Sequence, residues 1–305
     1  MVNFFSRYFE YFHRMLSYTE TPFQEIKDPV IAERGLRLVI KREDQNHPHI
    51  RGNKWWKLKY NLIEAKARGK SALLTYGGAY SNHIVATAAA AKESGFGSIG
   101  IIRGEKILPL NPALTMAKEF GMELHYLPRM AYRNKSKEDA FLSKFHDYFW
   151  IPEGGSNDLA IKGVKEFASG LGNDFDFVCC AVGTGGTLSG LIEGLPGSKR
   201  ILGFSSLKTG EFLIDEVRRL SEKGRSAMNW QIMLDYHYGG YAKKNAGLSK
   251  FIEQIGKEHN IPLEHVYTGK LMAGLFDLVK KGFFPRGSTI LAIHSGGFNH
   301  QAPVI

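Results

Sequence analysis

The amino-acid sequence predicts an α/β protein of two domains, each built on an open, mostly parallel, twisted sheet flanked by helices. From residue 35 onward, short runs rich in β-branched and aromatic residues alternate with segments of helical periodicity. Strands separated by helices of about ten or more residues are typical of βαβ units, and hence of parallel sheets. The composition agrees, because 43% hydrophobic and 23% charged residues in a chain of 305 are typical of a globular protein with a sizeable core.

The first half of the chain predicts three consecutive βαβ units. The helix over 81–95 is the best defined, since Ser81 or Asn82 caps its start and Gly95 ends it. The other helices are expected at 56–69 and 111–121, and the strands at 36–43, 71–76, 98–104 and 123–128. We therefore expect a smaller inserted α/β domain over 59–150, a larger domain formed by 1–58 and 151–305, and a return hinge at "IPEGG".

The second half continues the same alternation. Strands are expected at 175–182, 201–206 and 289–297, and helices at 159–171, from about Leu188, at 211–222 and at 269–281. Between residues 236 and 267 lies a tyrosine-rich stretch, in which tyrosines stand beside glycines in "YHYGGYAKKN" and "HVYTGK".

Charge and cysteine content exclude several classes of function. The net charge is +10, yet the basic residues are dispersed, so we do not expect specific nucleic-acid binding. No apolar run is long enough for a membrane span, and the first residues lack the apolar core of a secretory signal. Cys179 and Cys180 are adjacent in an expected strand and point to opposite faces, which argues against a disulfide or a metal site. We therefore expect a cytoplasmic protein without a metal.

Polar, glycine-rich turns follow four of the expected strands, where open α/β sheets bind ligands. They are "YGGAYSN" (76–82), "GGSN" (154–157), "GTGGTLSG" (183–190) and "HSGG" (294–297). In the third, an eight-residue strand runs into Gly183–Thr187 and a helix follows, so that successive N–H groups form a cradle for phosphate. The dinucleotide pattern fails because Leu188 replaces its last glycine, and the Walker pattern lacks GK[ST]. A site for a single phosphate group remains.

The stretch "GNKWWKLKYN" contains three candidate lysines. On a helix beginning near Trp55, Lys57 and Lys59 lie on the helix body and are expected to be helix cations. Lys54 sits at the preceding turn, where the chain faces a ligand. This favours Lys54 as the chemically special lysine.

Six segments match, in order, a known family. They are "KREDQ…GNKWWKLKYN", "GGAYSNH", "GTGGTLSG", "YGGYAKKNAG", "VYTGKLMAGL" and "IHSGG". Together they resemble the pyridoxal-phosphate enzymes that include D-cysteine desulfhydrase and 1-aminocyclopropane-1-carboxylate deaminase, over roughly residues 21–300. The resemblance implies the tryptophan synthase β-like fold, pyridoxal 5'-phosphate as cofactor, a small amino-acid substrate and, we expect, a homodimer.

The resemblance also assigns roles to residues. Lys54 would carry the cofactor as a Schiff base, which prepares the cofactor carbonyl for exchange with a substrate amine. Ser81 would stand near the substrate α-carbon, and Asn82 would hydrogen-bond the cofactor's phenolic oxygen. The remaining assignments are the phosphate loop (Gly183, Thr184, Gly185, Gly186 and Thr187), two tyrosines near the substrate (Tyr241 and Tyr267), and either Thr268 or Ser295 at the pyridine nitrogen.

Thr268 favours one reaction of this family. The deaminases carry a glutamate there, which keeps the pyridine nitrogen protonated and strengthens the electron sink needed to open a cyclopropane. A hydroxyl from Thr268 or Ser295 only hydrogen-bonds the nitrogen, which suits removal of the α-proton by Lys54 or Ser81 and loss of a β leaving group. His83, where deaminases usually show glutamine, favours the same interpretation. We expect β-elimination to a keto acid and ammonia, D-cysteine desulfhydrase-like. The alternatives are 1-aminocyclopropane-1-carboxylate deaminase and a cofactor-binding protein without turnover.

Three positions depart from the family pattern. Trp56 replaces an arginine, and Val85 and Ala86 replace an Arg-Gln pair. We expect substrate contacts or the subunit interface to differ there. Residues 1–14 precede the resemblance, so that either Met15 is the natural start or this aromatic arm packs on a partner subunit.

Overall fold

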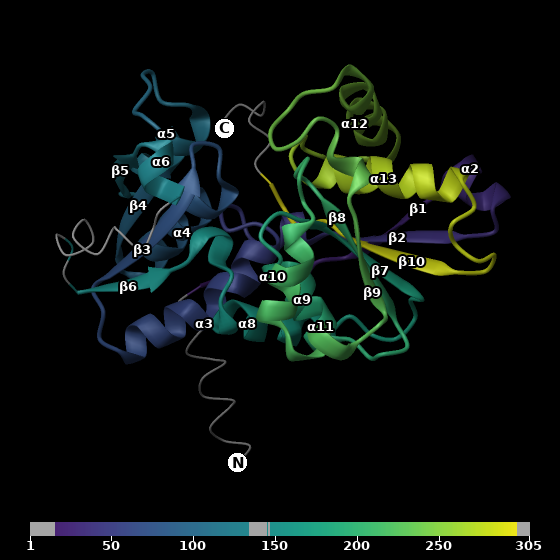
Figure 1. Ribbon diagram of the computed structural model, residues 1–305, viewed down its shortest axis with the longest axis horizontal. Coiled ribbons are helices and arrows are strands. Elements are labelled where there is room, and N and C mark those ends of the chain that lie inside the picture. The colour runs from purple at the N-terminus through teal and green to yellow at the C-terminus, as the bar shows by residue number, and fades with distance from the viewer. Residues whose placement is uncertain (1–15, 134–144, 146, 298–305) are drawn as a thin grey trace, which may run out of the picture.

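The structure is a computed structural model that describes residues 16–133, 145 and 147–297. It has two lobes, each built around one sheet (Figure 1). The expected arm over residues 1–14 lies outside the described residues. None of the helices in the described part of the chain is long and apolar enough to cross a membrane.

The larger sheet has six strands in the order β1-β2-β10-β7-β8-β9, and only β1 is antiparallel to its neighbour. Its strands are β1 (Phe23–Ile26), β2 (Arg37–Lys41), β7 (Phe177–Val182), β8 (Arg200–Ser205), β9 (Trp230–Met233) and β10 (Thr289–Ile293). Neighbouring residues of a strand belong to different cores: Cys179 packs with helices α2, α12 and α13, and Cys180 with α8, α9 and α10. Both cysteines are buried free thiols.

The helices that cover this sheet continue directly from its strands or return to them. On one face lie α2 (Pro29–Glu33), α12 (Ala246–His259) and α13 (Thr268–Lys280). On the other lie α8 (Asp158–Ser169), α9 (Gly186–Gly194) and α10 (Phe212–Leu220), with the short α11 (Glu222–Ser226) beside them. Short 3₁₀ turns occupy η1 (Glu43–Gln45), η3 (Glu153–Gly155) and η4 (Asp235–His237).

The smaller sheet has four parallel strands in the order β5-β4-β3-β6. They are β3 (Ala72–Gly78), β4 (Gly97–Arg103), β5 (Glu123–Leu127) and β6 (Tyr148–Ile151). Helices α3 (Asn53–Ala67), α4 (Asn82–Ser94) and α5 (Pro112–Glu119) pack against one face, and the short α6 (Arg129–Arg133) against the other. The α/β class with two mostly parallel sheets is therefore confirmed.

Most expected elements are present, with shifted ends. Ser81 caps α4 and Gly95 follows it in the left-handed region, as expected. Helix α3 starts at Asn53 rather than near Trp55, so that Lys54 lies in its first turn instead of the loop before it. The domain boundary expected at residue 58 falls inside this helix, which packs against both α8 and α4. The division into domains stays a prediction, although the strands do segregate as 72–151 in one sheet and the rest in the other.

Candidate active site

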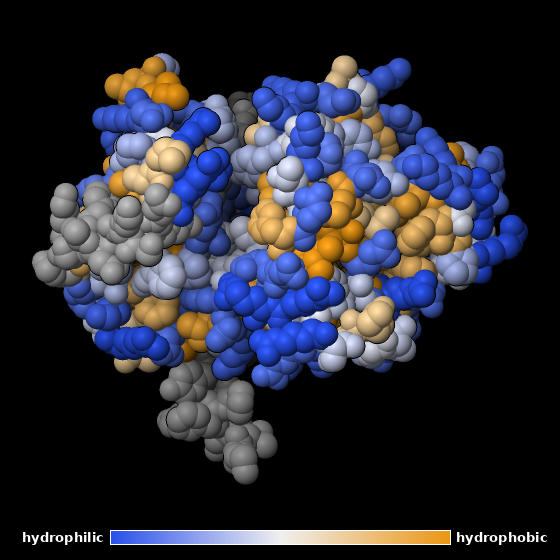
Figure 2. Space-filling view, in the orientation of Figure 1, coloured by the Kyte–Doolittle hydropathy of each residue, from blue (hydrophilic) through white to orange (hydrophobic). Residues whose placement is uncertain are grey.

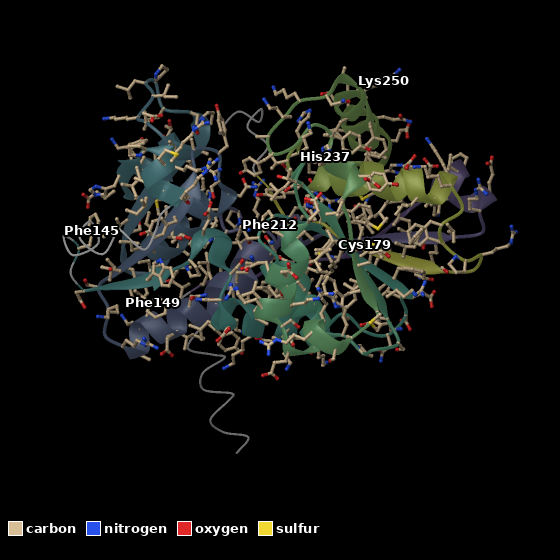
Figure 3. All side chains as sticks on the ribbon, in the orientation of Figure 1. Phe145, Phe149, Cys179, Phe212, His237 and Lys250 are labelled. Carbon is tan, nitrogen blue, oxygen red and sulfur yellow. The ribbon has the colours of Figure 1, made fainter. Side chains whose placement is uncertain are left out.

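A cavity of about 890 Å³ lies between the two lobes, at the carboxyl ends of their strands. Figure 2 shows this recess as a largely hydrophilic hollow, and Phe212 lies between the lobes in Figure 3. All four glycine-rich turns noted in the sequence contribute to its wall. This placement follows from parallel strands, whose carboxyl ends meet at the same edge of a sheet.

The cavity brings together almost all the site residues expected from the sequence. Its wall includes Lys54, Ser81, Asn82, Gly183, Thr184, Gly185, Gly186, Thr187, Tyr241, Tyr267 and Ser295. It also holds an excess of cations over carboxylates among the described residues: Arg51, Lys54, Lys57, Arg103, Arg133 and Arg219 against Glu153 and Glu216. Such a wall favours anionic ligands.

Gly52 places Lys54 against the end of β10. Its φ is +69°, and a Cβ at this position would lie 2.0 Å from the backbone oxygen of Ser295. Only glycine allows this approach. Asn46 holds the same glycine from the other side, because its side chain donates to Gly52 O (3.0 Å) and accepts from Gly52 N (2.9 Å). The first turn of α3 is therefore fixed beside the "HSGG" turn.

The loop Gly183–Thr187 is packed too tightly for a side chain at Gly183 or Gly186. A Cβ on Gly183 would lie 2.9 Å from the Tyr267 ring, and one on Gly186 would lie 2.6 Å from Ser156 Oγ. Hydrogen bonds hold its two threonines: Ser156 Oγ to Thr184 Oγ1 (2.7 Å), and Asn53 Nδ2 to Thr187 Oγ1 (2.7 Å). The loop leads into α9, so that backbone N–H groups and a helix N-terminus face the cavity.

Lys57 lines the cavity, although its place on the body of the helix predicted a helix cation. Its side chain is 2% exposed and lines the cavity. The ammonium donates to Gly154 O (2.9 Å) and Ser156 Oγ (3.3 Å), and lies 2.9 Å from the position of a Cβ on Gly186. No carboxylate pairs with it among the described residues. The spacing i, i+3 from Lys54 was a usable signal, since it puts both lysines on one helix face.

Lys54 is the more available amine of the two. No hydrogen bond joins its Nζ to another described residue, and burial lowers its pKa to about 8. A neutral amine is the nucleophilic form of lysine. By contrast, Lys59 turns away from the cavity and its ammonium pairs with Glu166 (2.7 Å), as expected for a helix cation.

His83 is a buried neutral imidazole whose tautomer follows from its neighbours. The Thr75 hydroxyl donates its only proton to Ile151 O (2.8 Å), so it must accept from His83 Nε2 (2.9 Å). The Nδ1 atom is then an unprotonated acceptor, and no described residue donates a hydrogen bond to it. Burial, reinforced by Lys54 and Lys57, holds the pKa of His83 well below its usual value.

Tyr241 and Tyr267 form a pair on the cavity wall, with ring centroids 6.1 Å apart. Burial raises the pKa of both phenols. A hydrogen bond between the two side chains opposes the rise for Tyr241 and adds to it for Tyr267. Both hydroxyls are therefore protonated at neutral pH, and Tyr241 is the more readily ionised of the two.

The two candidates for the pyridine nitrogen differ in position. Ser295 lines the cavity, whereas Thr268 does not. Thr268 is 1% exposed, and its hydroxyl donates to Glu264 Oε1 (3.2 Å) and accepts from Glu264 N (3.0 Å). Glu264 in turn accepts from the N–H groups of Tyr267 and Thr268 (both 2.7 Å) at the start of α13. The geometry therefore favours Ser295 over Thr268 as the candidate for the pyridine nitrogen.

Trp56 does not line the cavity. Its indole donates to the buried Glu43 (2.7 Å) and packs against Tyr18 and Phe167. The expectation that this position alters a substrate contact finds no support here. Ala86 does line the cavity, and Val85 is buried beside it.

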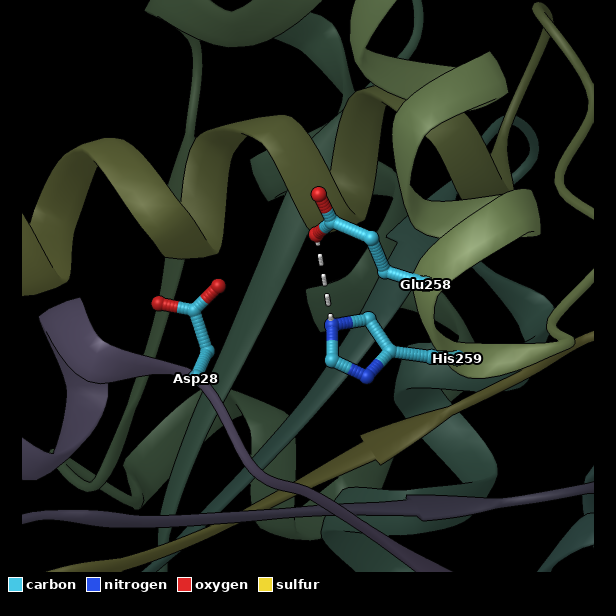
Figure 4. Close-up of side chains that lie close together, drawn as sticks. All are labelled: Asp28, Glu258 and His259. Carbon is cyan, nitrogen blue, oxygen red and sulfur yellow. Dashed lines mark ion pairs between the residues drawn. The ribbon is translucent and has the colours of Figure 1, made fainter.

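A group of potential metal ligands lies outside the cavity wall. Asp28, Glu258 and His259 place one ligand atom each within 4.8 Å of one another (Figure 4). Each carboxylate already has a structural contact: Asp28 accepts from Val30 N at the start of α2, and Glu258 accepts from Gln254. We assign this group no role.

Comparison with known proteins identifies the class. The chain matches the family described as "Pyridoxal-phosphate dependent enzyme" over residues 15–296, and it belongs to that family. A Pyrococcus abyssi protein provisionally named 1-aminocyclopropane-1-carboxylate deaminase is 32% identical over 91% of this chain and 89% of its own. A mitochondrial Arabidopsis thaliana protein named bifunctional D-cysteine desulfhydrase/1-aminocyclopropane-1-carboxylate deaminase is 28% identical over 92% of this chain and 77% of its own. A crystal structure described as an ACC deaminase homologue superposes with a TM-score of 0.77 and 29% identity, over 92% of this chain and 90% of that one.

Family membership implies pyridoxal 5'-phosphate as the cofactor, and the residues present fit it. The buried Lys57 ammonium lacks a carboxylate partner among the described residues, beside a glycine loop that opens a helix. A phosphate group supplies the missing anion. The amine of Lys54 lies on the same wall, within the same cavity. The expected cofactor is confirmed at the level of the family.

Proposed function

We propose that this enzyme catalyses β-elimination on a small amino acid, releasing a keto acid and ammonia, in the manner of a D-cysteine desulfhydrase. For D-cysteine, one water is consumed, and the products are pyruvate, ammonia and hydrogen sulfide. Bound pyridoxal phosphate supplies the electron sink that lets a proton leave the substrate α-carbon. The observation that carries the proposal is the hydroxyl of Ser295 on the cavity wall, with Thr268 in the place of the deaminase glutamate.

Lys54 is proposed as the group that takes the α-proton. Its amine has no hydrogen-bond partner among the described residues, and its pKa of about 8 makes a useful fraction neutral near physiological pH. Ser81 is the weaker candidate, because its Oγ already accepts from Ile84 N as the cap of α4. We assign Ser81 and the first N–H groups of α4 to the substrate carboxylate, since a helix N-terminus favours an anion.

Tyr241 and Tyr267 are proposed to face the leaving group. Both hydroxyls stay protonated at neutral pH and so act as hydrogen-bond donors or as a general acid. A departing thiolate needs such a donor, because the cavity otherwise removes it from water. This role is consistent with the position of the pair on the wall.

The test is a substrate panel with keto-acid detection on the cofactor-loaded protein. It contains D-cysteine, β-chloro-D-alanine, D-serine, L-serine and 1-aminocyclopropane-1-carboxylate. We expect turnover of the substrates that carry a β leaving group, and Lys54→Ala should abolish both turnover and the cofactor's visible absorbance. Retention of both after this substitution would contradict the proposal.

The alternative reaction is ring opening of 1-aminocyclopropane-1-carboxylate. It is favoured by the names of several relatives, including one from Rhizobium leguminosarum bv. viciae at 31% identity. A keto acid formed only from the cyclopropane would establish it and refute the argument from Thr268. Visible absorbance without any keto acid would instead indicate a cofactor-binding protein.

We further propose that the enzyme works as a homodimer in the cytoplasm. Two buried free thiols support a reducing compartment. Analytical ultracentrifugation of the cofactor-loaded protein tests the dimer, and a single species of monomer mass would contradict it.

A further inference from the structure

Lys270 is a buried cation that the proposed reaction does not use. It lies in the first turn of α13, and its side chain is 1% exposed. Buried lysines are rare because a charge removed from water must be compensated. Its ammonium donates to two backbone carbonyls, Gly240 O (2.7 Å) and Ser206 O (3.1 Å). Within the described part of the chain no carboxylate lies within ion-pair distance of it.

The two carbonyls belong to separate segments of the cavity wall. Ser206 follows β8, and both its N–H (3.0 Å) and its hydroxyl (3.2 Å) donate to Val182 O, directly before the phosphate loop. Gly240 directly precedes Tyr241. Lys270 itself stands three residues after Tyr267. One ammonium on α13 therefore contacts both the Tyr241 turn and the segment after β8, and that segment is itself bonded to the last residue of β7, before the phosphate loop.

The Tyr241 turn needs an external contact because its backbone is strained. Tyr238 (φ +47°) and Ala242 (φ +55°) are in the left-handed region, as are Gly239 (φ +91°) and Gly240 (φ +109°). A non-glycine residue in that region is strained, because its Cβ crowds the neighbouring backbone. Such a backbone persists when the surrounding structure holds it, and the bond from Lys270 to Gly240 O supplies that contact.

We propose that Lys270 is a positioning residue whose ammonium holds the turn over 238–243 so that Tyr241 stays against Tyr267 in the substrate site. The part that concerns catalysis rests on the proposed function. The part that concerns the turn does not, and the two are tested separately.

The first test measures the turn itself by limited proteolysis. Lys243 and Lys244 are exposed trypsin sites within two or three residues of Tyr241. Lys270→Met should raise the rate of cleavage after these lysines at least tenfold, because native-state proteolysis reports local opening. The control is Lys41→Met, which removes another buried lysine that donates to a backbone carbonyl, that of Thr21, on strand β2; unlike Lys270, Lys41 also lies 3.9 Å from a carboxylate, that of Glu43. Equal cleavage rates in the two variants would overturn the proposal.

The second test asks whether Lys270 acts through Tyr241. With the best substrate of the panel, Lys270→Met should lower kcat at least tenfold while the cofactor's visible absorbance stays unchanged. Combined with Tyr241→Phe, it should cause no further loss, since a residue that acts only by positioning Tyr241 has nothing left to position. Losses that multiply in the double variant would overturn the proposal.

A conservative variant distinguishes a local effect on the turn from a general loss of structure. Lys270→Gln keeps two N–H donors without the charge, and it should restore part of kcat and slow the tryptic cleavage. If both variants lose the cofactor absorbance, Lys270 supports the whole fold and the proposal is wrong. If the wild-type protein turns over no amino acid, the proposed function is wrong. The proteolysis experiment then remains as the test of whether Lys270 holds the turn.

Discussion

Lys57 offers the sharpest test of the site, because it is a buried lysine with no carboxylate partner among the residues that the structure describes. Its Nζ has two neutral partners, Gly154 O (2.9 Å) and Ser156 Oγ (3.3 Å), beside the phosphate loop. A charge-assisted hydrogen bond to the cofactor phosphate is worth about 1.5–3 kcal/mol. Lys57→Met should therefore weaken pyridoxal phosphate binding about ten- to 150-fold, since about 1.4 kcal/mol corresponds to a tenfold change in Kd.

The assay is titration of the apoprotein with pyridoxal phosphate, followed by visible absorbance. Lys59→Met is the matched control, because Lys59 lies on the same helix and is equally buried, but pairs with Glu166 (2.7 Å) outside the cavity wall. The control should leave the Kd unchanged and lower the free energy of unfolding, since it removes the ion pair of Glu166, which keeps only its hydrogen bond from Tyr60 (3.0 Å) among the described residues. Burial and the neighbouring Lys54 hold the pKa of Lys57 well below its usual value. Lys57→Met therefore removes a buried amine that has no carboxylate partner among the described residues, and it should not lower the stability of the apoprotein. Equal Kd values for both variants would refute the assignment of Lys57.

Three further predictions concern the geometry around Lys54. With a pKa of about 8, the neutral fraction of Lys54 rises about tenfold between pH 7 and pH 9 and then levels off. The rate at which the apoprotein binds pyridoxal phosphate should follow the same curve. A rate that still increases at pH 10 would indicate a lysine with an ordinary pKa. Gly52→Ala should lower the free energy of unfolding, measured by urea denaturation, by about 2–5 kcal/mol, because of backbone strain and the clash with Ser295 O. Gly69→Ala is the control: its φ of +63° is similar but the position is open, so the free energy of unfolding should fall by about 1–2 kcal/mol. Because burial keeps His83 neutral, His83→Gln should leave the acid limb of the pH profile of kcat/KM unmoved, and a shifted limb would show that this histidine titrates.

The fold was predictable because its signals are local. Period and turn chemistry located α4 with both its caps, and the alternation of strands and helices indicated parallel sheets. The sequence did not predict strands β1, β6 and β9, because each has only four residues and lies at an edge of its sheet, where packing rather than propensity decides. The sequence predicts the start of α3 near Trp55, later than the observed Asn53, because the N-cap residue is Gly52, which is a weak signal for a helix start.

The sequence by itself determined which glycine turns meet in the site, since such turns after parallel strands must gather at one edge. It also singled out Lys54, on a family resemblance that the comparisons confirm at the level of the family. Only the tertiary structure decided what those residues face. Lys57 turned out to point at the phosphate loop, Thr268 at Glu264, and Trp56 at Glu43. The direction of a side chain depends on contacts with segments distant in the chain, and spacing along one helix or loop does not specify them.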